Sequence, residues 1–317
     1  MTAPRVRLVC LVGPTTTGKT ALALELAERV GAEIVSADSR QVYRRLDVGT
    51  AKPTPAERAR VRHHCVDLVD PDATCDAARF RAAAVAAITD ATARGRPVLV
   101  VGGTGLWLRA LLHGLCPAPA RDPDIRAAID AVVHADGAPA VHRRLAVVDP
   151  AAAARIHPND RVRSVRALEV ALASGRPLSD WQAAHAFVDQ PFDALVVGLA
   201  RPVAELDARI AARAAAMVEA GFLDEVRALA QGVPADAPAW RTVGYREMRA
   251  CVEGQMSVEA ALAATVAATR RFAKRQRTWF RRETGVVWRH PEADRERIVG
   301  EACGFLAGRT VARAGLG

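Results

Sequence analysis

The chain of 317 residues has few lysines, few aromatic residues and no long hydrophobic run. Because no stretch of eighteen apolar residues is free of charge, we expect no membrane-spanning helix. The six cysteines include no C-x-x-C pair, which argues against a disulfide framework and favours free thiols. His63, His64 and Cys65 lack a second ligand pair at zinc spacing, so we assign no metal site to them.

The scarcity of lysine draws attention to the lysines that are present. The chain has 44 basic residues, and only Lys19, Lys52 and Lys274 among them are lysines. An ammonium is a compact point charge, whereas a guanidinium is a planar fork, so a site that needs one does not accept the other. The three lysines are therefore candidates for specific roles. The net charge of +9 and the pI near 9.9 indicate a polyanionic partner.

A glycine-rich turn near the N-terminus follows a short apolar run and precedes a helical pattern. We expect a strand over residues 7–12 and a helix over 19–30. The turn matches G-x-x-x-x-G-K-[ST], the P-loop of ATP- and other nucleotide-binding proteins. Its residues are Gly13, Pro14, Thr15, Thr16, Thr17, Gly18, Lys19 and Thr20. An ordinary Gly-Pro turn is the alternative, but the flanking strand and helix favour a site for a di- or triphosphate.

Strand and helix patterns alternate in the first third of the chain. Further strands are predicted at 33–36, 65–68 and 97–101, and helices at 76–94 and 106–113. From about residue 119 only helices are predicted, at 122–133, 139–147, 151–156 and 161–173. A strand at 195–199, helices at 203–220, 223–230, 245–253 and 257–282, a strand at 286–288 and a closing helix follow.

These patterns predict the α/β class, with a P-loop NTPase-like parallel sheet flanked by helices. The predicted core consists of residues 1–118 and 195–317. Residues 119–194 are predicted to form an all-helical insertion domain.

One feature of P-loop NTPases and kinases is missing. These proteins usually carry a second acid at the end of a buried strand, whereas "PVLVVGG" ends in glycine. A carboxylate, Asp38, instead follows the second strand directly, at the sheet edge where such folds bind ligands. It could bind a metal or accept a proton. A role in capping the loop is the alternative for Asp38.

Seven segments together resemble the tRNA dimethylallyltransferase family, also called tRNA isopentenyltransferases or IPP transferases. The segments are "GPTTTGKT", "SADSRQVYRRLDVGTAKP", "HHCVDLVDP", "VLVVGGTGLWLRALLHG", "RIHPNDRVRSVRALEV", "VGYREM" and "TRRFAKRQRTWFRR". They occur in unbroken order from residue 8 to about 288. One departure is Trp107, where the family pattern leads us to expect tyrosine, and we expect this change to affect packing or the edge of the channel.

The resemblance implies a transfer of a dimethylallyl group from dimethylallyl diphosphate to N6 of adenosine 37, beside the anticodon. The substrates would be tRNAs that read codons beginning with U, and the products N6-isopentenyladenosine and diphosphate. Asp38 would accept the proton, and Thr20 would support the diphosphate or the Mg²⁺ cofactor. Arg213 would bind the diphosphate as a third catalytic residue, although a solvated helix face is its alternative.

The resemblance also implies that the core's C-terminal helices and the insertion domain contact an anticodon stem-loop whose adenine is flipped out. In the last long helix Arg270, Lys274, Arg277 and Arg281 form one basic stripe, for which a merely solvated face is the alternative. Whether Trp279 belongs to the core is left open. The implied RNA contacts are Asp38, Ser39, Arg40, Gln41, Thr104, Arg126, Val162, Arg163, Ser164, Val165, Arg166, Thr242, Val243, Gly244, Tyr245, Arg246, Glu247, Lys274, Arg275, Gln276, Arg277, Thr278, Trp279, Phe280 and Arg281.

Two other functions are compatible with parts of the sequence. A small-molecule kinase would need nucleotide-dependent phosphate transfer and the acid that the buried strand lacks. A non-catalytic RNA-binding module would keep its RNA affinity after Lys19→Ala. For the transferase we expect a cytoplasmic protein without a membrane or an obligate protein partner, since a monomer bound to one tRNA suffices.

Overall fold

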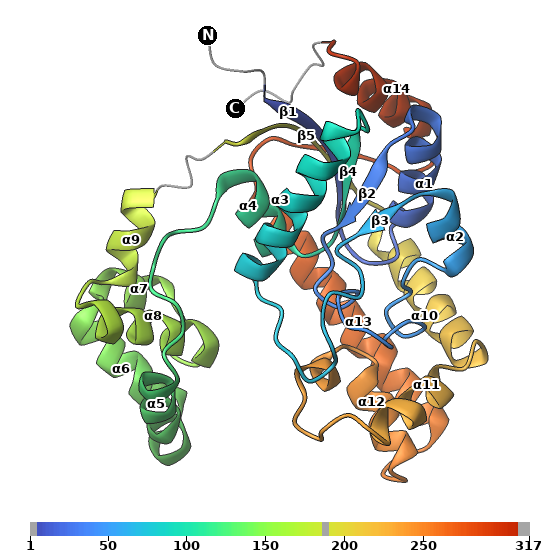
Figure 1. Cartoon of the computed structure of the whole chain (residues 1–317). Helices are drawn as coiled ribbons and strands as arrows, with labels where there is room; N and C mark the ends of the chain where they lie inside the picture. The colour runs from blue at the N-terminus through green and yellow to red at the C-terminus, as the bar shows by residue number, and fades with distance from the viewer. Residues whose placement is uncertain (1–4, 186–189, 310–317) are drawn as a thin grey trace. The chain divides into compact units, whose positions relative to one another are not determined.

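The computed structural model describes residues 5–185 and 190–309 (Figure 1). The described residues form a six-stranded parallel sheet in the order β3-β2-β4-β1-β5-β6. The strands are β1 (Val6–Val12), β2 (Glu33–Ser36), β3 (His63–His64), β4 (Val98–Gly102), β5 (Phe192–Leu199) and β6 (Val286–Arg289). The predicted fold class, a parallel sheet flanked by helices, is thereby confirmed.

Strand β1 lies inside the sheet, between β4 and β5, and its residues Leu8–Leu11 have no exposed surface. Helices α1 (Lys19–Val30) and α14 (Arg295–Leu306) cover one face of the sheet. Helices α3 (Ala77–Ala93) and α4 (Gly105–His113) cover the other face (Figure 1). Because both faces of the sheet are covered, the neighbouring central strands β1 and β4 are nearly continuous apolar runs without alternation.

The strand predicted at residues 65–68 is wrong. Pairing to β2 ends at His64, and the two residues Cys65 and Asp67 have φ of 60° and 56°, in the left-handed region. The chain therefore leaves the sheet at residue 64, four residues before the predicted end of the strand. Asp67 forms ion pairs with Lys52 and Arg58 instead of continuing the strand, and the local sequence pattern does not reveal these partners.

The other elements agree with the helical pattern except for two short helices that the sequence reading missed. These two are α2 (Pro55–Arg60) and α9 (Leu178–His185). The remaining elements are α5 (Pro123–Asp136), α6 (Ala138–Val148), α7 (Pro150–Arg155), α8 (Arg161–Ser174), α10 (Val203–Glu219), α11 (Phe222–Ala230), a 3-10 turn (Pro238–Arg241), α12 (Tyr245–Val252) and α13 (Val258–Phe280).

The chain divides into two compact units. One consists of residues 1–112 and 191–317, and the other of residues 113–190. The predicted insertion, 119–194, starts six residues later and ends four residues later than this unit. Its end differs because β5 already begins at Phe192. Residues 1–4, 186–189 and 310–317, which the prediction assigned to these domains, lie outside the described residues.

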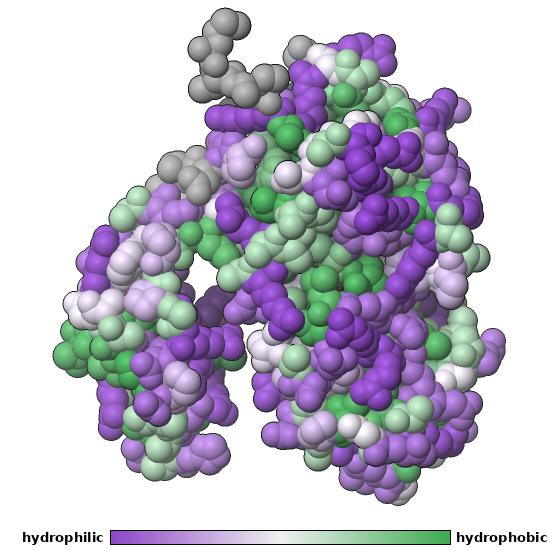
Figure 2. Space-filling model, in the orientation of Figure 1, coloured by the Kyte–Doolittle hydropathy of each residue, from purple (hydrophilic) through white to green (hydrophobic). Residues whose placement is uncertain are grey.

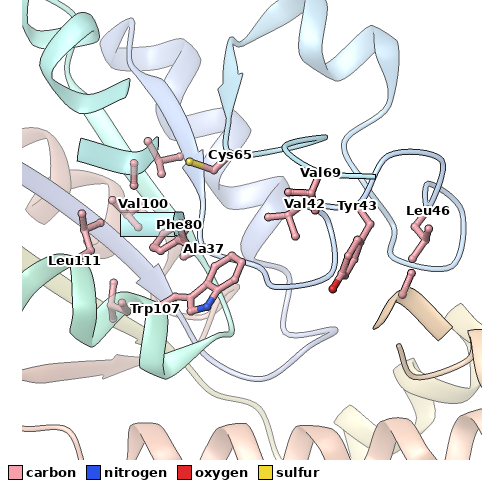
Figure 3. Close-up of a cluster of buried hydrophobic side chains, with 14 of the residues drawn as sticks. Ala37, Val42, Tyr43, Leu46, Cys65, Val69, Phe80, Val100, Trp107 and Leu111 are labelled. Carbon is pink, nitrogen blue, oxygen red and sulfur yellow. The ribbon is translucent and has the colours of Figure 1, made fainter. Parts of the chain in front are cut away.

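Side chains of the large unit form a buried cluster beside the loop that follows β2 (Figure 3). Trp107 is 3% exposed and stacks on Phe80, with ring centroids 4.4 Å apart and planes at 15°. Val42, Tyr43 and Leu46 of the loop belong to the same cluster. The structure thus places Trp107 in the core.

The face of the molecule drawn in Figure 2 is largely polar. No helix in residues 5–185 and 190–309 is long and apolar enough to cross a membrane. Hydrophilic residues predominate on the face seen in Figure 2, and apolar residues appear between them in smaller groups.

Two charged side chains hold the loop between β2 and α2 in place. Lys52, whose side chain is 1% exposed, donates to the Tyr43 carbonyl at 2.8 Å, to Asp47 at 2.5 Å and to Asp67 at 2.7 Å. The Glu225 carboxylate of α11 accepts the N–H groups of residues 47–49 at 2.7–3.2 Å. An ammonium suits the first site because its three N–H bonds reach three separate oxygens.

Lys52→Met should lower the free energy of unfolding by about 3 kcal/mol, because it leaves two carboxylates and a carbonyl without their buried cation. Urea denaturation followed by circular dichroism measures this loss. The exposed Lys274 provides a matched control, and Lys274→Met should change the same free energy by less than about 0.5 kcal/mol. Equal losses in the two variants would mean that the three contacts of Lys52 do not stabilise the loop.

Candidate functional site

A cavity of about 1350 Å³ lies at the carboxyl ends of the central strands, in the large unit. The phosphate loop, Gly13–Thr20, contributes residues 15, 16 and 18–20 to its wall. The loop after β2 contributes Asp38 and Gln41, α10 contributes Arg213, and α13 contributes Gln276. Parallel sheets bind ligands at this edge, where the turns after several strands converge.

Glycines let the phosphate loop turn between β1 and α1. Gly13 has φ of +135°, and a Cβ atom there would lie 2.6 Å from the Leu199 carbonyl oxygen of β5. Gly18 has φ of +98° and precedes the first turn of α1. Side chains other than hydrogen are therefore excluded at Gly13 by both space and conformation.

Side chains bind the carbonyl groups of the phosphate loop. Lys19 Nζ donates to Gly13 O at 2.9 Å and to Pro14 O at 2.6 Å. Arg209 Nε donates to Thr16 O at 3.1 Å, and Arg201 Nε donates to Thr17 O at 3.2 Å. In a trans peptide the N–H points opposite to the carbonyl, so the N–H groups of Thr17 and Gly18 point away from these arginines. Such N–H groups, together with the start of a helix, form a site for an anion.

Two cations and one carboxylate share the cavity. The pKa of Lys19 is lowered to about 8, mainly by burial; the negative charge of Asp38 opposes this shift, and the positive charge of Arg213 adds to it. Burial likewise lowers the pKa of Arg213, and Asp38 partly offsets this. A bound anion would favour the charged form of both groups, because it replaces the water that they lose.

Asp38 is held in place by the backbone of its own loop. Its Oδ1 accepts the Arg40 N–H at 2.8 Å, and within the described part of the chain Oδ2 makes no hydrogen bond. Thr104, after β4, binds the residues on both sides of Asp38, since its N–H donates to Ala37 O and its Oγ1 accepts the Ser39 N–H. Gln41 donates to Ala51 O and accepts from the Ser36 hydroxyl. One carboxylate oxygen is thus available to a ligand in the cavity.

The predicted RNA-contacting residues of α13 differ in exposure. Lys274, Arg275, Thr278 and Arg281 are exposed, Arg277 is partly exposed, and Gln276 and Phe280 are buried. The half-buried Trp279 packs against Gly105 and lies under the Arg109 guanidinium, 4.9 Å from the ring centroid. The basic stripe is therefore an exposed surface, and Trp279 contributes to packing beneath it.

The predicted segment 242–247 is mostly buried. Tyr245 donates to Glu225, and both burial and this carboxylate raise the pKa of the phenol. Glu247 accepts the Gly244 N–H and binds Arg246, which is the exposed residue of the segment. Thr242 is buried and Val243 partly buried.

In the small unit, Arg126 and Arg166 both bind the fully buried carboxylate of Glu169, at 3.0 and 2.7 Å. Val162 and Arg163 are exposed at the start of α8, whereas Ser164 and Val165 are buried. The arginine pair therefore neutralises a buried charge, and Val162 and Arg163 are available to a partner. The two arginines remain about one-third exposed.

Sequence reasoning missed Arg201 and Arg209, the arginines that bind the phosphate loop. The side chain of Arg201 is 2% exposed and also pairs with Glu205 and Glu292. Because arginine supplies nearly all basic residues of this chain, neither residue stands out in the sequence. Among the described residues no group of three or more His, Cys, Asp or Glu is placed to hold a metal ion.

Residues 41–283 match the family model described as IPP transferase. The chain belongs to the IPP transferase family. It is 55% identical over 293 residues to the tRNA dimethylallyltransferase of Anaeromyxobacter dehalogenans strain 2CP-C, covering 92% of this chain and 98% of the relative. It is 48% identical over 302 residues to that of Geobacter metallireducens, covering 95% and 98%. The resemblance inferred from the seven segments is confirmed.

Two solved structures have the same fold as this chain. The tRNA isopentenylpyrophosphate transferase of Bacillus halodurans is 36% identical, with a TM-score of 0.70 over 95% of this chain and 97% of that chain. A eukaryotic dimethylallyltransferase acting on tRNA is 23% identical, with a TM-score of 0.83 over 96% and 81%. The second likeness concerns the fold alone.

The lowered pKa of Lys19 predicts a pH dependence of anion binding. Lys19 loses its proton as the pH rises through about 8, so its contribution to pyrophosphate binding is present at pH 7 and decreases toward pH 9. The ratio of the pyrophosphate affinities of the parent chain and Lys19→Ala should fall about tenfold between pH 7 and pH 9. Isothermal titration calorimetry measures both affinities. The ionisation of pyrophosphate affects both affinities equally and cancels in this ratio. A ratio that does not change with pH would contradict the lowered pKa of Lys19.

Proposed function

We propose that the chain transfers a dimethylallyl group from dimethylallyl diphosphate to N6 of adenosine 37 in tRNAs that read codons beginning with U. The products are N6-isopentenyladenosine and diphosphate. The observation that supports this best is one cavity whose lining includes the phosphate loop with Lys19, the Arg213 guanidinium and the Asp38 carboxylate. Relatives about half identical over nearly the full chain carry the name of this activity.

The anion-binding half of the cavity suits the leaving group. When the allylic C–O bond breaks, negative charge develops on the diphosphate and positive charge on the allyl carbon. Lys19, Arg213 and the loop N–H groups stabilise that negative charge as it forms. Their own desolvation makes the interaction stronger than it would be in water.

A magnesium ion fits this half of the cavity if the diphosphate supplies most of its ligands. The Thr20 hydroxyl lines the cavity and would be a protein ligand, and Mg²⁺ commonly binds few protein oxygens together with phosphates and water. When bound, the ion neutralises charge on the leaving diphosphate.

The acceptor half of the cavity suits an amine that must lose a proton. Exocyclic N6 of adenine is a weak nucleophile, so a carboxylate aligned with it raises the rate of attack. The Arg40 N–H holds Asp38 by one oxygen, and the other oxygen orients N6 and accepts its proton. An adenine inside a stacked loop cannot reach Asp38, so the base is flipped out of the anticodon loop.

The exposed basic residues suit an RNA backbone. Lys274 and Arg275 of α13, and Arg281 directly after it, lie on the large unit, and Arg163 lies on the small unit. Charge contacts of this kind position an RNA, while the flipped adenine is read inside the cavity. A cytoplasmic monomer would suffice for this reaction.

Asp38→Asn should lower the rate of prenyl transfer by about a hundredfold or more, because the amide cannot accept the proton. The affinity for the anticodon stem-loop should stay within about twofold, since the amide oxygen still accepts the Arg40 N–H. The assay supplies an unmodified tRNA, Mg²⁺ and dimethylallyl diphosphate, and nucleoside digestion then quantifies isopentenyladenosine.

Asp72→Asn, an exposed position outside the cavity, is the control and should keep full activity. Undiminished transfer by Asp38→Asn would move the role of base to another residue. If the parent chain forms no isopentenyladenosine but transfers phosphate from a nucleotide, the proposed reaction is wrong and the chain is a kinase.

A further inference from the structure

Gln276 joins two loops of the cavity from the buried side of α13. Its Oε1 accepts the Thr15 N–H of the phosphate loop at 2.9 Å, and its Nε2 donates to the Gly103 carbonyl at 3.0 Å. The residue is 7% exposed, whereas Lys274 and Arg275 on the same helix are exposed. Gln276 therefore faces the diphosphate half of the cavity rather than the basic surface of α13.

Both backbone partners of Gln276 require an amide. The oxygen meets a donor and the nitrogen meets an acceptor, so only one orientation of the amide satisfies both. A glutamate would set a carboxylate oxygen against the Gly103 carbonyl. A methionine of similar length would leave the Thr15 N–H and the Gly103 carbonyl without this partner.

The amide also fills the space beyond β4, where P-loop NTPases and kinases usually carry an acid. A Cβ atom at Gly103 would lie 2.1 Å from Gln276 Nε2, and one at Gly102 would lie 2.2 Å from the Ala37 carbonyl oxygen. Glycine is therefore required at the end of β4 and directly after it, because the Ala37 carbonyl and the Gln276 amide occupy the space that a side chain would need. A neutral amide stands beside the phosphate loop in place of a carboxylate.

We propose that Gln276 is a positioning residue for the diphosphate. By binding Thr15 and Gly103 it fixes the first half of the phosphate loop, and it keeps the space beyond β4 uncharged. It acts through the loop backbone and does not contact RNA, although it lies within the basic segment of α13. This inference rests on the proposed function, because the anion that it concerns is the diphosphate of the donor.

The test measures three quantities on the full chain: the affinity for inorganic pyrophosphate with Mg²⁺, the KM for dimethylallyl diphosphate, and the affinity for an anticodon stem-loop. Gln276→Met should weaken pyrophosphate binding about tenfold or more and raise the donor KM to a similar extent. Its affinity for the stem-loop should stay within about twofold of the parent. Gln276→Glu should bind pyrophosphate more weakly still, because its charge repels the anion.

Lys274→Gln is the matched comparison on the same helix and should show the opposite pattern. It should lose stem-loop affinity and keep pyrophosphate affinity, since Lys274 is exposed and absent from the cavity wall. If Gln276→Met instead loses stem-loop affinity and binds pyrophosphate normally, Gln276 is an RNA contact and the inference is overturned. If the parent chain does not bind pyrophosphate, the proposed function itself fails.

A second measurement does not depend on the folding of Gln276→Met. Gly103→Ala should weaken pyrophosphate binding, because its methyl group displaces the amide. The double variant Gly103→Ala with Gln276→Ser should bind pyrophosphate no more weakly than Gln276→Ser alone, since the shorter side chain makes room. Additive losses would show that the two residues do not share this space and would overturn the inference.

Discussion

The site depends on the orientation of the peptide groups in the phosphate loop. Side chains from inside and outside the loop bind that backbone, and Arg201, Arg209 and Gln276 come from segments far from the loop in sequence. Lys19 binds two of the loop's carbonyls from within. Each such bond fixes one peptide plane and thereby the direction of the next N–H. The shape of the anion site is therefore a property of the folded unit and not of the eight loop residues alone.

The acceptor side of the cavity is built by the same physical means. Lys52 and Glu225 bind the backbone of the loop after β2, and this loop carries Asp38 and Gln41 in the wall of the same cavity as the phosphate loop. A charged side chain that binds several backbone groups restricts a loop more than apolar contacts do, because hydrogen bonds have direction. Two of the three lysines thus serve as buried or partly buried point charges, where a guanidinium would not fit.

The sequence predicts those features whose cause is local, and it misses those whose cause is distant. The strand, turn and helix of the phosphate loop follow from residues 7–30. Helix α2 also has a local signal, the capping box of Thr54 and Glu57, although it is absent from the predicted helices. The strand at 65–68 fails because Asp67 bonds to Lys52, fifteen residues away. The helical spacing puts Gln276 on the buried face of α13 with Ala273 and Phe280, but no local pattern reveals its partners Thr15 and Gly103, which are distant in sequence.

The absence of an acid after β4 has a chemical reason if the bond that breaks is the allylic C–O bond. A kinase directs a nucleophile at phosphorus, so its acids gather with the metal around the phosphates. In prenyl transfer the attack is at carbon, and the diphosphate only leaves. A carboxylate near the leaving group would then oppose the charge that develops on it, whereas a carboxylate beside the incoming amine assists the attack. The structure fits this division of charge, because Gln276 and Gly103 lie beside the phosphate loop without a carboxylate, and Asp38 in the same cavity keeps one oxygen for the incoming amine.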